Sequence, residues 1–145
     1  MKSSQQEIII NYAAKDLYNI VLDIEKYPEF IPWCEAIYII SKSKNEIIAD
    51  MIVKHKYSLP QKFTSHVFFN SKNFSINTNY IQGPLKDLKT EWNFMKLEQN
   101  KTKVLFKVKF EFQKFFHQKL AEMFFKLIEN KMIDSFKKRS EEILD

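Results

Sequence analysis

Histidines are the side chains that most often hold a metal or act as a base in proteins, and this chain has three, His55, His66 and His117. None has a second ligand-type residue at the spacing that a metal site requires. Alternation along the strand that we expect around His66 places it beside Thr64 on the solvent side. We therefore expect all three histidines to be surface or structural residues.

The single cysteine, Cys34, follows Pro32 and Trp33. A cysteine acts as a nucleophile when a neighbouring group stabilises its thiolate, and the sequence around Cys34 offers no obvious base. We expect Cys34 to be a small buried apolar residue. One cysteine also excludes an internal disulfide and an all-cysteine metal site, and it fits a reducing compartment.

Four carboxylates surround the same proline-containing segment, namely Asp23, Glu25, Glu29 and Glu35. Paired carboxylates can do acid–base work, but here we expect them to cap a helix and to solvate a loop. With no strong catalytic constellation, we expect a binding protein rather than an enzyme, without a metal or a covalent cofactor.

Aromatic residues are unusually frequent, with 14 Phe, 6 Tyr and 2 Trp against one Gly. Such a surplus indicates either a well-filled core or a roomy pocket with aromatic walls. The scarcity of glycine argues against Gly-rich phosphate loops and dinucleotide-binding turns. Hydrophobic residues make up 45% and charged residues 28% of the 145 residues, which is typical of one folded domain, 1–145.

Period-two alternation of apolar and polar residues predicts seven strands. We expect them at Gln6–Asn11, Ile37–Ser41, Glu46–His55, Gln61–Phe69, Asn73–Ile81, Leu88–Leu97 and Lys103–Gln113. Links as short as Ser71–Lys72 require antiparallel neighbours, because a parallel crossover takes about a dozen residues. Helical spacing predicts one helix over Ala13–Glu25 and a long one from Phe116 of roughly 25 residues. The fold class is therefore α+β, with the irregular segment Tyr27–Trp33 after the first helix.

The widths of these elements predict an interior gap. Seven strands about 4.8 Å apart span close to 30 Å, whereas one helix is only about 10–12 Å across. The sheet must therefore curl around the long helix, and the space between them is either filled by rings or left as an apolar cavity. We expect the cavity to be bordered by Phe63, Val67, Ile76, Trp92, Phe94, Phe106, Val108, Phe110, Phe124 and Ile128, with Trp33 and Leu85 near its mouth.

Either indole N–H, of Trp33 or Trp92, is a candidate to hold the polar end of a ligand, and either residue could equally be core.

The formal charge is +5 with a pI near 9.1, almost all of it from lysine. A Lys-rich solvated surface explains this charge, and the alternative is an anionic partner such as RNA or a lipid head group. Candidates for a basic patch are Lys54, Lys56, Lys107, Lys109 and Lys137–Arg139, diluted by Asp50, Glu111 and Glu141–Glu142. No recognised RNA-reading motif is present in the sequence, and we expect no DNA partner.

The first residues, Met1–Glu7, are polar, so we expect no signal peptide, and no stretch reaches the length of a membrane span. A cytoplasmic location is expected, with peripheral contact with the inner membrane as an alternative.

Several runs resemble the coenzyme Q-binding START-like family. They are Asp23–Cys34, whose Tyr-Pro-x-Phe-x-Pro-Trp-Cys pattern is fairly specific, and the weaker Phe63–Val67, Gly83–Leu88, Trp92–Phe94 and Val108–Phe112. The resemblance implies a helix-grip fold. Leu85 stands where the family tends to have Phe.

Family members have two known roles. Mitochondrial members bind ubiquinone and support respiration, and bacterial members, which this chain resembles, are also called ribosome association toxins because one is reported to block joining of the ribosomal subunits. Some START-like relatives are named polyketide cyclases. We therefore expect a carrier of ubiquinone or a similar isoprenoid lipid, with a ribosome-binding regulator that acts on the large subunit as the alternative and a cyclase-like enzyme as a third.

Overall fold

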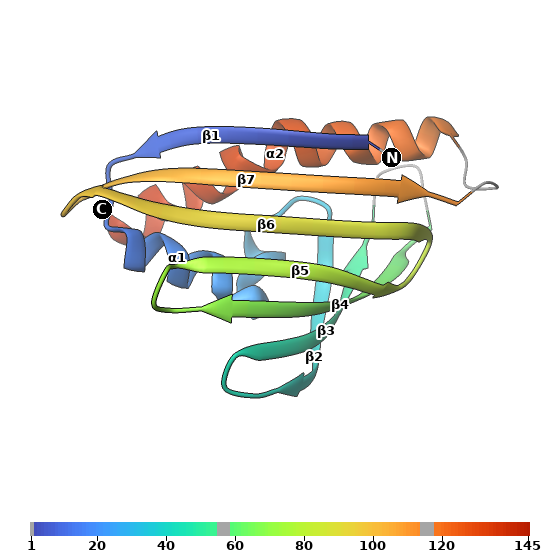
Figure 1. The fold of residues 1–145 in the computed structure, drawn as a ribbon. Coiled ribbons are helices and arrows are strands. Elements are labelled where there is room, and N and C mark those ends of the chain that lie inside the picture. Colours follow the sequence, from blue (N-terminus) through green and yellow to red (C-terminus); the bar gives the residue numbers. More distant parts are fainter. Residues whose placement is uncertain (1, 55–58, 114–117) are drawn as a thin grey trace.

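The computed structural model describes residues 2–54, 59–113 and 118–145. His55, Lys56 and His117, for which predictions were made above, lie outside the described residues, as does the predicted helix start at Phe116. The elements are β1 (Lys2–Ile10), α1 (Ala14–Leu22), η1 (Ile24–Glu29, a 3-10 helix), β2 (Cys34–Lys42), β3 (Glu46–Val53), β4 (Gln61–Asn70), β5 (Ser75–Gln82), β6 (Leu85–Glu98), β7 (Lys101–Phe112) and α2 (Gln118–Leu144) (Figure 1).

The strands form one seven-stranded antiparallel sheet in the order β1-β7-β6-β5-β4-β3-β2. This is a meander from β2 to β7, closed by the N-terminal strand on the far edge of β7. Figure 1 shows β2 and β3 turned steeply away from the direction of β5–β7, so the sheet is strongly curved, with both α-helices on its concave side. The α+β class, the antiparallel pairing and the curvature predicted from the sequence are confirmed.

The long helix α2 runs along β1 and β7 and meets α1 near its C-terminal end. The core lies between it and the concave face, where Phe106 and Phe110 are 1% and 0% exposed. On β7 the predicted alternation is confirmed, because Val108 is buried while Lys109 on its other face is exposed.

The segment after the first helix differs from its prediction. Helix α1 ends at Leu22 rather than Glu25, and Ile24–Glu29, which includes Pro28, forms the 3-10 helix η1. The Asp23 N–H donates to the Asn19 carbonyl and closes α1 there. A short 3-10 turn tolerates proline because few of its N–H groups have an intrahelical acceptor to lose.

Candidate functional site

An apolar cavity of about 120 Å³ lies between the concave face of the sheet and α2. Six strands, η1 and α2 contribute its wall. The bordering residues are Ile24, Tyr27, Ile37, Ala49, Met51, Phe63, Ser65, Val67, Ile76, Thr78, Leu88, Thr90, Trp92, Phe106, Val108, Phe110, Phe124, Ile128, Met132 and Phe136. Of the two fillings that the sequence left open, the gap is therefore an apolar cavity, although a small one.

Most of the residues predicted to border this cavity do so. They are Phe63, Val67, Ile76, Trp92, Phe106, Val108, Phe110, Phe124 and Ile128. Their rings pack closely around the space: the Trp92 and Phe106 centroids are 4.5 Å apart, and Phe63 stacks on Phe124 at 5.4 Å. Strand alternation and helical spacing thus brought together side chains from four strands and a helix.

Phe94 is buried but does not border the cavity, so its predicted place in the wall is wrong. Trp33 and Leu85, which were predicted near the mouth, are also buried and are not among the wall residues. Trp33 lies in the turn between η1 and β2, where its carbonyl accepts the Lys54 N–H. Phe94 is directed toward α1, with its ring 6.2 Å from that of Tyr18. For Phe94, strand parity gave the buried face correctly but not the position along it.

Leu85 begins β6, and Tyr80 fixes its position. The Tyr80 hydroxyl accepts the Leu85 N–H and donates to the Leu85 carbonyl, both at 2.9 Å. Between them Gly83 has a φ of 153°, and a Cβ there would lie 2.8 Å from the Lys62 carbonyl oxygen. The turn is therefore specified by glycine and by a tyrosine clamp, and it does not open into the cavity.

Three hydroxyl side chains border the otherwise apolar wall, and the sequence-based list of cavity residues did not include them. They are Ser65 on β4, Thr78 on β5 and Thr90 on β6. Thr78 and Thr90 are direct cross-strand partners, and Val67, next but one to Ser65, faces Thr78. Within the described residues no side-chain hydrogen bond engages these hydroxyls. Their parity with Phe63, Ile76 and Trp92 was the signal that could have identified them.

One end of the cavity is closed by aromatic contacts between η1 and α2. Phe136 borders the cavity and makes edge-to-face contacts with Tyr27, Phe30 and Trp92, at centroid distances of 5.2, 5.1 and 5.1 Å. The Tyr27 hydroxyl donates to the Val21 carbonyl. Edge-to-face aromatic pairs add about 0.5–1.5 kcal/mol each beyond burial, so this junction holds α2 against η1.

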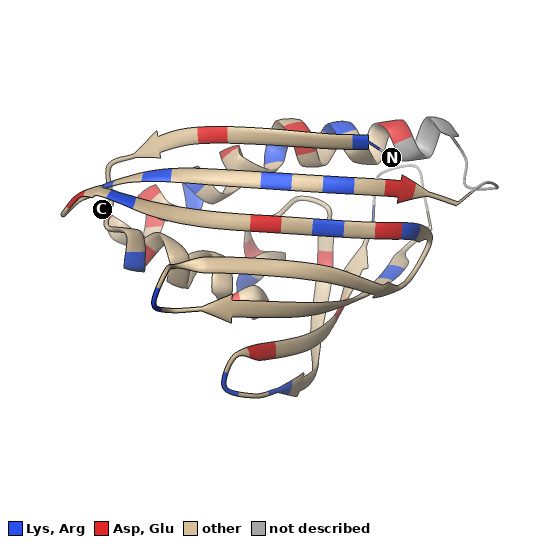
Figure 2. Ribbon diagram, viewed as in Figure 1, with Lys and Arg blue, Asp and Glu red and all other residues tan. Residues whose placement is uncertain are grey.

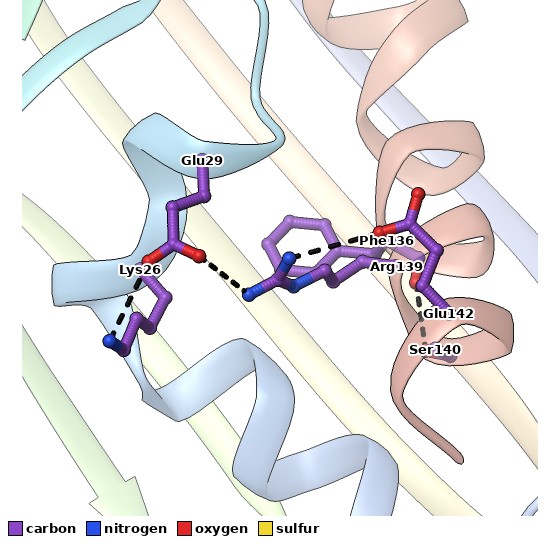
Figure 3. Close-up of polar contacts among 6 residues, drawn as sticks. All are labelled: Lys26, Glu29, Phe136, Arg139, Ser140 and Glu142. Atoms are coloured by element: carbon purple, nitrogen blue, oxygen red, sulfur yellow. Dashed lines mark hydrogen bonds and ion pairs between the residues drawn. The ribbon is translucent and has the colours of Figure 1, made fainter. Parts of the chain in front are cut away.

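The only arginine of the chain, Arg139, covers the outside of that junction (Figure 3). Its Nη2 lies 3.1 Å from Glu29 Oε1, its Nη1 lies 3.8 Å from Glu142 Oε2, and its guanidinium lies 5.1 Å from the Phe30 ring centroid. Glu29 also pairs with Lys26 at 3.6 Å. The predicted solvating role of Glu29 therefore includes an ion pair that joins η1 to α2.

The groups considered for chemistry in the sequence lie away from the cavity. Cys34 is buried, and burial raises the pKa of its thiol from 9.0 to about 11, as expected of a structural cysteine rather than a nucleophile. His66 lies on the outer face, as predicted, with Nε2 3.3 Å from Glu46 Oε2 and its ring 4.0 Å from that of Phe68. Among residues 2–54, 59–113 and 118–145 no group of three His, Cys, Asp or Glu is placed to hold a metal ion.

Tyr27 is the ionisable residue at the described cavity wall, and burial raises the pKa of its hydroxyl. The rest of the described wall contains no carboxylate, imidazole, ammonium or thiol group.

The described helices include none that is both long enough and apolar enough to cross a membrane.

Solved structures share this architecture. A Streptomyces aromatase/cyclase, Zhui, superposes with a TM-score of 0.87 at 13% identity, covering 99% of this chain and 96% of that one. An 18 kDa protein of Caulobacter crescentus superposes with a TM-score of 0.77 at 24% identity, covering 99% and 98% of the two chains. At these identities the likeness establishes the fold alone.

Sequence relatives are closer. The chain is 33% identical to the ribosome association toxin RatA of Rickettsia prowazekii, over 99% of both chains. It is 30% identical to the mitochondrial coenzyme Q-binding protein COQ10 of Drosophila melanogaster, over 91% of this chain and 57% of the relative. The family model for polyketide cyclase/dehydrase and lipid transport proteins matches residues 10–137. The chain therefore belongs to the polyketide cyclase/dehydrase and lipid transport family and has its START-like fold.

Proposed function

We propose that this protein binds ubiquinone, or a similar hydrophobic molecule with a carbonyl-bearing ring, and acts as its carrier in support of respiration. The observation that carries the proposal is the apolar cavity under α2, whose sheet wall has three hydroxyls with no side-chain hydrogen bond to any described residue. A quinone ring is flat and apolar apart from two carbonyl oxygens, which accept hydrogen bonds. Thr78 and Thr90, side by side at the cavity, would donate to one of them.

The cavity volume limits which part of such a ligand is enclosed. An apolar cavity of roughly 150 Å³ holds one benzene molecule in another protein, and the cavity here measures about 120 Å³. It is therefore close to the size of one unsubstituted six-membered ring, whereas the substituents of a ubiquinone ring and its isoprenoid tail require α2 to move away from the sheet or the tail to leave the cavity. We propose that the ring is enclosed and that α2 shifts to admit the tail.

Binding rather than catalysis is supported by the composition of the wall. Acid–base catalysis needs a group whose pKa lies near the working pH, and the described wall offers only hydroxyls and Tyr27, whose pKa burial raises. The name of the Drosophila relative, a coenzyme Q-binding protein, supports the choice of ligand class.

Organic extraction of protein purified from a quinone-producing host, followed by mass spectrometry, tests the proposal. We expect ubiquinone or a related prenyl lipid in the wild-type extract. Ala49→Leu, which places extra carbon atoms in the cavity, should lower its amount at least tenfold. Ala36→Leu, at an outward-facing position of the adjacent strand β2, is the matched control and should retain it. Lipid-free wild-type protein, or equal lipid in both variants, would overturn the proposal.

A second function, binding to the large ribosomal subunit with inhibition of subunit joining, is favoured by separate observations. The ribosome association toxin of Rickettsia is a full-length relative, and this chain has a net charge of +5. Sucrose-gradient sedimentation after overexpression tests this function, and we expect free subunits to increase at the expense of monosomes. Unchanged subunit and monosome peaks would remove it.

A further inference from the structure

The outer face of the sheet carries three lysines that form no ion pair with any other residue in the described part of the chain. Lys107 and Lys109 alternate with the buried Phe106, Val108 and Phe110 along β7, so their side chains leave the opposite face. Lys89 on β6 lies directly across from Lys109. We call these three residues, Lys89, Lys107 and Lys109, the lysine face. Figure 2 shows basic positions on β6 and β7 next to one another, with acidic positions between them along β6.

The arrangement of the lysine face differs from that of other lysines on the same strands. Lys103 lies 2.9 Å from Glu7, and Lys86 lies 3.4 Å from Glu111. Within the described residues, none of the three lysines of the lysine face forms an ion pair, although Glu91 stands across from Lys107 in the strand register. Glu91 instead accepts a hydrogen bond from the Asn93 amide at 3.0 Å.

The Lys89–Lys109 pair is unfavourable for the isolated fold. Like charges directly opposite one another on adjacent strands repel and destabilise a sheet. An anion placed between the two ammonium groups would remove this repulsion. The same register places carboxylates on both sides of this pair, with Asp87 across from Glu111 and Glu91 across from Lys107. The unbalanced positive charge is therefore centred on Lys89 and Lys109, where an anion would complete the arrangement.

The surroundings of the lysine face indicate which anion fits. The next strand carries two amide side chains, Asn77 and Asn79, directly across from Glu91 and Lys89. Beyond them on β4, in register with the same two asparagines, lie Phe68 and His66, whose rings are 4.0 Å apart. Phosphate oxygens accept from ammonium groups, amides bond to base edges, and aromatic rings stack with unpaired bases.

We propose that the lysine face binds the phosphate backbone of RNA, with Asn77, Asn79 and the His66–Phe68 pair alongside the bases. This rests on the second proposed function and identifies the surface through which the protein would reach the ribosome. The ligand cavity lies on the opposite side of the same strands, so both sites can be occupied together.

Fluorescence anisotropy with a labelled 20-nucleotide single-stranded RNA at several salt concentrations tests the proposal. The triple variant Lys89→Gln/Lys107→Gln/Lys109→Gln is compared with Lys15→Gln/Lys44→Gln/Lys72→Gln, which removes the same charge from exposed positions elsewhere. Each phosphate contact contributes about 0.7 to the slope of log K against log salt for single strands. We therefore expect the slope to fall by about 2 in the first variant and to stay near wild type in the second.

Three outcomes would overturn the proposal. The first is that the wild type does not bind RNA at low salt. The second is that the two variants lose equal affinity for RNA. The third is that the first variant loses affinity only for vesicles containing phosphatidylglycerol and not for RNA. The last outcome would assign the lysine face to a membrane. Circular dichroism melting serves as the folding control, and we expect the first variant to melt no lower than wild type because it loses a repulsive pair.

Co-sedimentation with purified ribosomal subunits tests RNA binding by the lysine face separately from the proposed ribosome-binding function. If the wild type sediments with the large subunit and the lysine-face variant does not, both stand. If both proteins sediment equally, the lysine face is the wrong surface while the ribosomal function stands. If neither sediments but the variant still loses its RNA affinity, the ribosomal function fails and RNA binding by this face stands.

Discussion

The concave and convex faces of the sheet differ in the polarity and charge of their side chains. On β7, Phe106 and Phe110 border the cavity while Lys107 and Lys109, one residue away, leave the other face. The concave face has rings and three hydroxyls but no full charge among its described wall residues. The convex face has lysines that form no ion pair with any described residue. The comparison teaches that strand alternation alone allows two binding surfaces to be changed independently, because neighbouring residues in the sequence belong to different surfaces.

The largest expected effect on stability separates the faces directly. Phe110→Ala removes a fully buried ring that contacts Phe124 and Phe125, and should lower the free energy of unfolding by about 3–5 kcal/mol. Lys109→Ala, its neighbour on the outer face, should change it by no more than about 0.5 kcal/mol. Urea denaturation at equilibrium measures both. Similar losses in the two variants would mean that the faces are not energetically distinct.

The β5–β6 turn provides the next largest effect. Gly83→Ala should lower the free energy of unfolding by about 1–3 kcal/mol, because the new Cβ meets the Lys62 carbonyl and the Tyr80 hydroxyl at 2.8 Å. Gln82→Ala, one residue earlier, is the control and should be nearly neutral. Thermal melts followed by circular dichroism would reveal the difference, and an unchanged melting temperature in Gly83→Ala would contradict the proposed requirement for glycine.

Cys34, a buried residue, should make the free energy of unfolding depend on pH. Since burial raises the pKa of its thiol from 9.0 to about 11, folding favours the neutral form. The resulting stabilisation is complete below pH 9 and is lost as the pH rises through 11. The difference in unfolding free energy between wild type and Cys34→Ala should therefore shrink over that interval, as measured by urea titrations at matched pH. A constant difference would show that the thiol pKa is not raised.

The smallest effect concerns the junction between η1 and α2. Glu29→Gln removes the ion pair with Arg139, and because Glu29 is half exposed we expect a loss of only about 0.2–1 kcal/mol. If α2 moves during ligand exchange, a bound quinone should nevertheless be released faster from Glu29→Gln than from wild type. Stopped-flow tryptophan fluorescence measures the release rate. Glu142→Gln, which removes the longer contact of Arg139 within α2, is the control. Equal release rates in both variants would exclude the junction from ligand exchange.

Much of the fold followed from the sequence, because its main features depend on periodicity. The strand order, the antiparallel pairing, the long helix and nine of the 20 residues of the cavity wall needed only alternation, helical spacing and short links. Two features depended on contacts instead. The 3-10 helix η1 is set by where α1 ends relative to Pro28. The absence of Phe94 from the wall is set by its packing against Tyr18 of α1, and that of Leu85 by the hydrogen bonds with Tyr80.

The volume of the cavity also could not be predicted from the sequence. It depends on the distance at which α2 packs and on the rotamers of rings such as Phe124 and Phe136, and neither is encoded in a local pattern. Parity could have placed Ser65, Thr78 and Thr90 at the wall, but the sequence could not show that their hydroxyls have no hydrogen-bond partner among the described side chains.

Methyl NMR during titration with a short-chain ubiquinone tests the central claim most directly. Methyl groups of Val67, Ile76 and Val108 border the cavity, whereas those of Ile48 and Ile52 occupy the outward-facing positions of β3. Saturable shifts of the first group, with the second group unchanged, are the result that we predict. Shifts confined to the outward-facing methyls, or no saturable shifts at all, would contradict a ligand site beneath α2.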